Sequence, residues 1–305
     1  MFSKILIPLD GSDAAAGVLA PAQVIAKATG ASTQLVNIHD GVVSDDVQYH
    51  LTQVKSELEA SGLAVEITIR PGSPADAIVA EAVASGADVI AMATHGRSGI
   101  SRAFLGSVAE QVLSESPVPV LLFRPDGHVM QSVGTVLVPV DGSPGGNLAL
   151  ASAVALARSV NARVVLLQVV VPTLAYTAMD VGMYGGGIWF DPAWDEDSLA
   201  SAKHYVEGLS KRLNESGIQA NGIAIMGGVV TPSLSVAETI IASAEENHAD
   251  LIVMSTHAHT GAARILLGSV SDALVRNSHR PVLMVRRGGV AEERANSALP
   301  AMVVT

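Results

Sequence analysis

The stretch "ATHGRSGISRAFLGS", residues 93–107, contains residue types that could bind a phosphate. Gly96 allows the backbone to approach a ligand closely or to adopt a positive φ. Gly106 and Ser107 precede the helical pattern "VAEQVL", so their amides and the serine hydroxyl would face an anion from a helix N-terminus. Arg97 could add a charge-assisted contact to a phosphate. We therefore expect either a phosphate-binding segment here or, more simply, a glycine-containing turn before a helix.

The two standard nucleotide motifs are disfavoured. A P-loop needs G-x-x-x-x-G-K-[ST], and the chain contains no Gly-Lys dipeptide. A Rossmann fingerprint needs G-x-G-x-x-G directly after the first strand, where the chain reads "DGSDAA". A nucleotide site would therefore need another architecture.

A carboxylate is expected near this stretch. The first apolar segment ends in "PLDGS", which places Asp10 just after a strand. It could accept hydrogen bonds from an adenine amino group or a ribose hydroxyl. Asp-Gly-Ser is also a common tight turn with a helix N-cap, and for this motif taken alone the turn is the favoured interpretation.

Other kinds of chemistry find little support. His257 and His259 form a His-x-His pair, but the spacing identifies no third metal ligand, so no metal site is expected. Ser12 and Ser107 lack a recognisable activating base, so no catalytic residue is assigned. The absence of cysteine excludes disulfides and thiol catalysis.

The elements that must position these residues occur twice in the chain. "KILIPLDGSD", from residue 4, returns as "TVLVPVDGSP" from residue 135, and "ADVIAMATHGRSG" returns as "ADLIVMSTHAHTG". The offset between the copies grows from 131 to 162 residues, so the second copy carries 31 extra residues. Most of them fall near 172–200, which contains Trp189 and Trp194. We interpret that segment as an insertion that packs over an exposed edge or forms a binding lid.

Each copy alternates apolar runs with Ala-rich helical patterns. In "PADAIVAEAVASGAD" the spacing places Ala77, Ile78, Ala82 and Val83 on one buried face. The pattern predicts an α/β fold of two doubly wound domains, each a five-stranded parallel sheet with helices on both faces. Ligands of such sheets bind at the carboxyl ends of the strands. The strands predicted in the first copy are Ile5–Leu9, Thr33–Ile38, Val65–Arg70, Val89–Ala93 and Pro119–Phe123.

Composition limits the classes of partner. The net charge of -11 argues against nucleic-acid binding. No apolar run approaches the length of a membrane helix, and the apolar run in "MFSKILIPLDGSD" is too short for a signal sequence. We expect a cytoplasmic protein without nucleic-acid or membrane partners. The predicted domains are 1–126 and 134–287, followed by a C-terminal tail at 288–305.

With these motifs and the repeat, the chain resembles a tandem-type universal stress protein of the ATP-binding subgroup. The resemblance covers residues 2–125 and 134–287. That subgroup carries G-x2-G-x9-G-[ST], and the first copy reads Ala93-x2-Gly96-x9-Gly106-Ser107, with only the first glycine changed. The implied fold in each half is that of the adenine nucleotide α-hydrolase-like proteins.

The resemblance also implies the roles of individual residues. Asp10 would contact adenine, the chain around Ile38 would close over the base, and the Gly96 loop would hold ribose and phosphates. The implied nucleotide-site residues are Pro8, Leu9, Asp10, Ile38, Met92, Ala93, Gly96, Arg97, Ser98, Gly106, Ser107 and Val108 in the first copy, and Asp141, Ser255, Gly268, Ser269 and Val270 in the second.

The second copy departs further from the pattern. It reads Ser255-x2-Ala258-x9-Gly268-Ser269, so two of the three glycines are replaced. A β-carbon at a loop position that needs a positive φ costs on the order of 1 kcal/mol. We therefore expect unequal sites, with the weaker one in the second copy.

The function implied by the resemblance is an ATP-binding stress-response regulator. It would bind ATP, with or without Mg²⁺, and hydrolyse it slowly at most. The alternatives are a scaffold protein without nucleotide, acting through protein contacts, and a slow ATPase. The resemblance further implies that the last strands, "VPVLLF" and "PVLMV", pair to make an intramolecular pseudo-dimer. A further homodimer and regulatory protein partners are also expected.

Overall fold

The computed structural model describes residues 2–39, 44–94, 105–128, 130–172, 192–228, 232–256 and 268–286. Buried apolar runs form the strands of the first half, and they agree with the predicted strands to within one residue at each end. These strands are β1 (Lys4–Pro8), β2 (Ser32–His39), β3 (Val65–Pro71), β4 (Val89–Ala93) and β5 (Val120–Phe123). Those of the second half are β6 (Thr135–Pro139), β7 (Arg163–Val170), β8 (Ala220–Met226), β9 (Leu251–Thr256) and β10 (Val282–Arg286).

Helices follow most strands, as the alternating pattern predicts. The first half contains α1 (Asp13–Ala16), α2 (Leu19–Thr29), α3 (Asp45–Ala60), α4 (Pro74–Ser85) and α5 (Ser107–Glu115). The second half contains α6 (Pro144–Val160), α8 (Pro192–Glu215), α9 (Pro232–Glu246) and α10 (Ser269–Asn277). The helix α8 takes in residues 192–200 of the predicted insertion, and residues 173–191, with Trp189, lie outside the described ranges.

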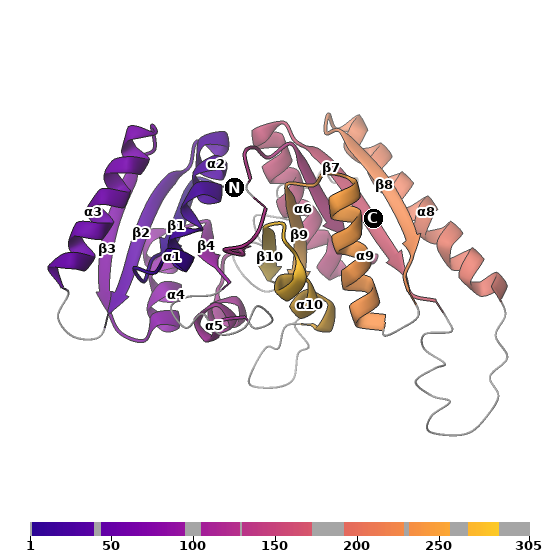
Figure 1. Ribbon diagram of the computed structural model, residues 1–305. Helices are drawn as coiled ribbons and strands as arrows, with labels where there is room; N and C mark the ends of the chain where they lie inside the picture. Colours follow the sequence, from indigo (N-terminus) through magenta and orange to yellow (C-terminus); the bar gives the residue numbers. More distant parts are fainter. Residues whose placement is uncertain are drawn as a thin grey trace, which may run out of the picture.

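Over the described residues, the ten strands form one sheet in the order β3-β2-β1-β4-β5-β10-β9-β6-β7-β8 (Figure 1). Neighbouring strands within each half are parallel, whereas β5 and β10 are antiparallel, with Leu121 opposite Leu283. The predicted pairing of the last strands in an intramolecular pseudo-dimer is therefore confirmed. It covers a sheet edge that each half alone would expose.

Two apolar cores cover the two faces of the sheet. One core packs side chains of α2, α3, α6 and α8 on the sheet, and the other packs α4, α5, α9 and α10 on the opposite face. Both cores run through both halves. The α/β architecture with helices on both faces is as expected.

The buried face of α4 differs from the prediction. Ala75, Ile78, Glu81 and Ala82 are buried, whereas Val83 is 62% exposed. A core stripe follows steps of three and four residues, so the helix turns Val83 away once Ala75, Ile78 and Ala82 face the sheet. Glu81 completes this stripe because other elements supply its polar partners.

Among the described residues, none of the helices combines the length and the apolar character needed to cross a membrane. The predicted C-terminal tail at 288–305 lies outside the described residues.

Candidate functional site

The carboxyl ends of β1 and β4 lie side by side. These strands pair in parallel, with Leu6 opposite Ile90, and they end at Pro8 and Ala93. The chain proceeds from β1 to β2 and β3 on one side and to β4 and β5 on the other, so strand order reverses between β1 and β4 (Figure 1). That reversal is the usual ligand position in doubly wound sheets. The structure thus brings the segments after Leu9 and after Ala93 to the same edge.

Asp10 begins a tight turn at this edge. Its Oδ1 accepts hydrogen bonds from the Ser12 amide at 2.9 Å and the Ser12 hydroxyl at 2.6 Å. Gly11 has a φ of 82°, and Ser12 caps α1 by accepting from the Ala15 amide at 3.1 Å. The turn and N-cap considered as the simpler interpretation are therefore present. They also fix the orientation of the half-buried Asp10 carboxylate.

The backbone before Asp10 is anchored by a residue that the sequence interpretation missed. Asn37, near the end of β2, is buried and donates from Nδ2 to the Leu9 carbonyl at 2.7 Å. The Leu9 amide donates to the Val36 carbonyl at 2.9 Å. The available signal was a polar residue among the apolar residues of "QLVNI". Asn37 holds the end of β1, and with it the Asp10 turn.

The two described ends of the 93–107 segment are joined by a hydrogen bond. The Gly106 amide donates to the Thr94 carbonyl at 2.8 Å, and the first helical bond of α5 runs from the Glu110 amide to the Gly106 carbonyl at 2.9 Å. Gly106, the N-cap, therefore uses its own amide within the loop. The amides of Ser107, Val108 and Ala109 open the helix, as in any α-helix N-terminus. Ser107 is exposed, so this end of α5 is accessible to an anion.

The other residues predicted for the first half's site differ in how far they are buried. Met92 and Ala93 are buried, at 7% and 9% exposure, so their side chains belong to the sheet core. Pro8 and Ile38 are half-buried at the ends of their strands. Gly96, Arg97 and Ser98 lie outside the described residues, so their roles stay predictions.

The second half repeats the two described features. The Ser143 amide donates to Asp141 Oδ1 at 2.9 Å, with Gly142 at a φ of 76°. Gly268 is the N-cap of α10, and the Asp272 amide donates to its carbonyl at 2.9 Å. The remaining predicted residues of this half are the buried Ser255, the exposed Ser269 and the half-buried Val270. The loop with His257, Ala258 and His259 lies outside the described residues.

Tyr205 distinguishes the second half from the first. Burial raises the pKa of the Tyr205 hydroxyl, and the nearby Asp141 carboxylate raises this pKa further, with an opposing contribution from Arg212. Tyr205 lies in α8, and aligning "LEASGL" with "LNESGI" places His50 at the equivalent point of α3. The sequence interpretation missed Tyr205, because only the packing of α8 brings it near Asp141.

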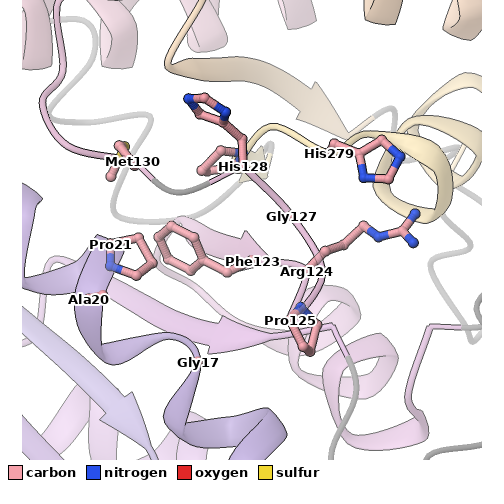
Figure 2. A pocket seen from close by; sticks show the side chains of 11 residues that line it. Gly17, Ala20, Pro21, Phe123, Arg124, Pro125, Gly127, His128, Met130 and His279 are labelled. Carbon is pink, nitrogen blue, oxygen red and sulfur yellow. The ribbon is translucent and has the colours of Figure 1, made fainter.

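Two other features bear on possible chemistry. No group of three or more His, Asp or Glu side chains among the described residues could hold a metal ion. A cavity of about 100 Å³ lies where the two halves meet, and its polar lining includes Arg124, His128 and His279 (Figure 2). None of the predicted nucleotide-site residues lines it.

Comparison with known proteins agrees with the architecture. A universal stress protein of Thermus aquaticus is 31% identical over 137 residues, covering 41% of this chain and 100% of that protein. One of Mycobacterium tuberculosis is 27% identical over 207 residues, covering 67% of this chain and 64% of that protein. The crystal structure of a universal stress protein from Archaeoglobus fulgidus shares the fold, with a TM-score of 0.65, 21% identity and coverage of 94% of this chain and 100% of that chain.

The sequence profile described as the Universal stress protein family matches the chain twice, at residues 1–124 and 133–286. These two matches correspond to the two halves of the sheet, each with its own Asp-Gly-Ser turn and glycine-capped helix. The chain therefore belongs to the universal stress protein family and carries two copies of its characteristic unit.

Proposed function

We propose that this protein is a nucleotide-binding stress-response regulator that binds ATP at the carboxyl edge of the first half's sheet. The observation that carries the proposal is the 2.8 Å hydrogen bond from the Gly106 amide to the Thr94 carbonyl. Because Thr94 follows β4 and Asp10 follows the adjacent β1, this bond ties the N-terminus of α5 to the edge of the sheet at which the Asp10 turn lies. One edge thereby offers a carboxylate for a base or ribose and helix amides for phosphates.

In this proposal Asp10 contacts the adenine, and Pro8, Leu9 and Ile38 lie beside the base. The amides of Ser107 and Val108 donate hydrogen bonds to phosphate oxygens. Gly96, Arg97 and Ser98 complete the phosphate-binding loop. ATP binds with or without Mg²⁺. The protein acts in the cytoplasm as two domains, 1–126 and 134–287, with 288–305 as a tail. A homodimer and regulatory protein partners belong to the same proposal.

We assign no catalytic residue, because the chain contains no P-loop lysine motif and its motifs identify no base that would activate Ser12 or Ser107. Any hydrolysis is therefore expected to be slow. The second half is proposed to bind more weakly, because its predicted loop carries Ala258 in place of a glycine.

Calorimetric titration of the intact chain with ATP tests the proposal. Asp10→Ala should weaken binding about tenfold or more, the effect expected for loss of a hydrogen bond to a charged group. Asp141→Ala makes the same change in the second half and is the matched control, which should leave the tighter site in place. A stoichiometry near zero for the native chain would contradict nucleotide binding and favour the scaffold alternative. Phosphate release that disappears in Asp10→Ala and Gly96→Val would instead favour a slow ATPase.

A further inference from the structure

We infer that each half's candidate phosphate-binding helix is positioned by an arginine from the other half. Arg286, at the end of β10, holds α5, and Arg124, just after β5, holds α10. Both are positioning residues that act through the helix. The inference rests on the proposed function where it concerns nucleotide affinity, and on geometry alone where it concerns the helices.

The two contacts are reciprocal. Arg286 donates from a terminal guanidinium nitrogen to the Ser114 carbonyl at 2.7 Å, and Arg124 donates in the same way to the Arg276 carbonyl at 2.6 Å. The donors are 162 residues apart, and so are the acceptors, which is the offset of the repeat in this region. The repeated sequence therefore makes one interaction twice, once in each direction across the β5–β10 junction. Figure 2 shows Arg124 extending toward the loop that carries His279.

Each acceptor lies in the last turn of its helix. Ser114 precedes the end of α5 at Glu115, and Arg276 precedes the end of α10 at Asn277. The last carbonyls of a helix have no intrahelical partner and carry the negative end of the helix dipole. A guanidinium group supplies both a donor and a positive charge there. The two arginines thus cap the C-termini of α5 and α10 from the opposite half.

The capped helices are the ones that begin at the candidate sites. The helix α5 starts at Ser107, with Gly106 as its N-cap, and has nine residues, so it is about 13 Å long. A short helix moves as a unit, and fixing its C-terminus fixes the direction of its N-terminal amides. Loss of Arg286 should therefore affect the first half's site, and loss of Arg124 the second half's.

The environments of the two arginines differ. Arg124 also makes paired contacts of 3.0 Å with Asp126, and this hydrogen bonding lowers the pKa of the Asp126 carboxyl. Arg286 Nε is buried without a partner in the part of the chain that the structure describes. The residue equivalent to Asp126 is Gly288, which has no carboxylate. The Arg124 guanidinium is thus held by Asp126 as well as by its contact to α10.

Variants that isolate one site at a time can show whether each arginine affects the site in the other half. Ser269→Asp places a carboxylate at the start of α10, where it favours the helix dipole but repels a phosphate, so that only the first half's site should still bind ATP. Ser107→Asp makes the same change at α5, so that only the second half's site should still bind. Arg286→Met and Arg124→Met are then compared in each background by ATP titration, with Arg286→Lys, which keeps the charge, as the conservative variant.

In the Ser269→Asp background, Arg286→Met should weaken ATP binding, because the N-terminal amides of α5 are then no longer held in a fixed direction toward the phosphates. Arg286→Lys should recover part of that loss, and Arg124→Met should have less effect than Arg286→Met. The order of Arg286→Met and Arg124→Met should reverse in the Ser107→Asp background. Equal effects of the two arginine variants, or an unchanged affinity in Arg286→Met, would overturn the inference.

Hydrogen exchange separates this inference from the proposed function. Arg286→Met should speed exchange in residues 107–115 more than in 269–277, and Arg124→Met should do the opposite. If neither single-site background binds ATP, the proposed function fails and the exchange pattern alone decides the arginine contacts. Equal acceleration in both helices, or none, would overturn them.

Discussion

A buried polar cluster at the residue scale distinguishes the first half from the second. Glu81, in α4, accepts hydrogen bonds from Gln34 at 2.6 Å and from Arg70 at 2.6 Å. Gln34 also donates to Thr68 at 2.7 Å. The repeat offsets place Val165, Ser243 and Ile225 at the positions of Gln34, Glu81 and Arg70. The second half therefore builds the same part of the sheet with little polar pairing.

Arg70→Ile should destabilise the protein by about 1–3 kcal/mol, because it leaves the buried Glu81 carboxylate without its cation. The estimate is below that for a fully buried pair because the Arg70 side chain is 50% exposed. The triple variant Gln34→Val, Arg70→Ile and Glu81→Ser copies the second half and should recover most of the loss. Urea denaturation of the three proteins measures both changes. A triple variant less stable than Arg70→Ile would contradict this account.

At the scale of elements, the second half differs from the first in the close packing of α8 on β8. Gly222, in β8, faces the α8 backbone, and a β-carbon added there would lie 2.5 Å from the Val206 carbonyl oxygen. The first half has Ile67 at this position of β3. The helix and the strand approach so closely in the second half because that glycine has no side chain.

Gly222→Ala should therefore be destabilising by about 1–3 kcal/mol, since backbone atoms must move to admit the methyl group. Gly208→Ala, within α8, is the matched control. Its β-carbon would come no closer than 3.9 Å to Arg212, and alanine in a helix interior should stabilise by about 0.5–1 kcal/mol. Thermal unfolding followed by circular dichroism should give opposite shifts. If both variants shifted the unfolding temperature in the same direction, the packing of β8 on α8 would not be what excludes a side chain at residue 222.

At the scale of the whole molecule, the sequence predicts local elements better than contacts between them. The apolar runs predicted the strands, because burial on both faces leaves a clear pattern. The β5–β10 pairing was expected only from the family resemblance. The predicted face of α4 was wrong at Val83, which is exposed. Glu81 was missed because its burial depends on Gln34 and Arg70 in other strands. Asn37 and Arg286 were missed for the same reason. The Asp10 turn was predictable because Asp-Gly-Ser makes its own hydrogen bonds.

The antiparallel β5–β10 pair makes the two halves depend on each other. Leu121 and Leu283 are opposite one another and fully buried, so separated halves would each expose an apolar strand edge. Residues 1–128 and 130–305, co-expressed as two chains, should therefore co-purify as a one-to-one complex. Arg124→Met combined with Arg286→Met should weaken that complex, because both arginines cross the junction. Light scattering after size exclusion gives the mass of the complex. Separate elution of two folded halves would show that the shared sheet is not what holds the molecule together.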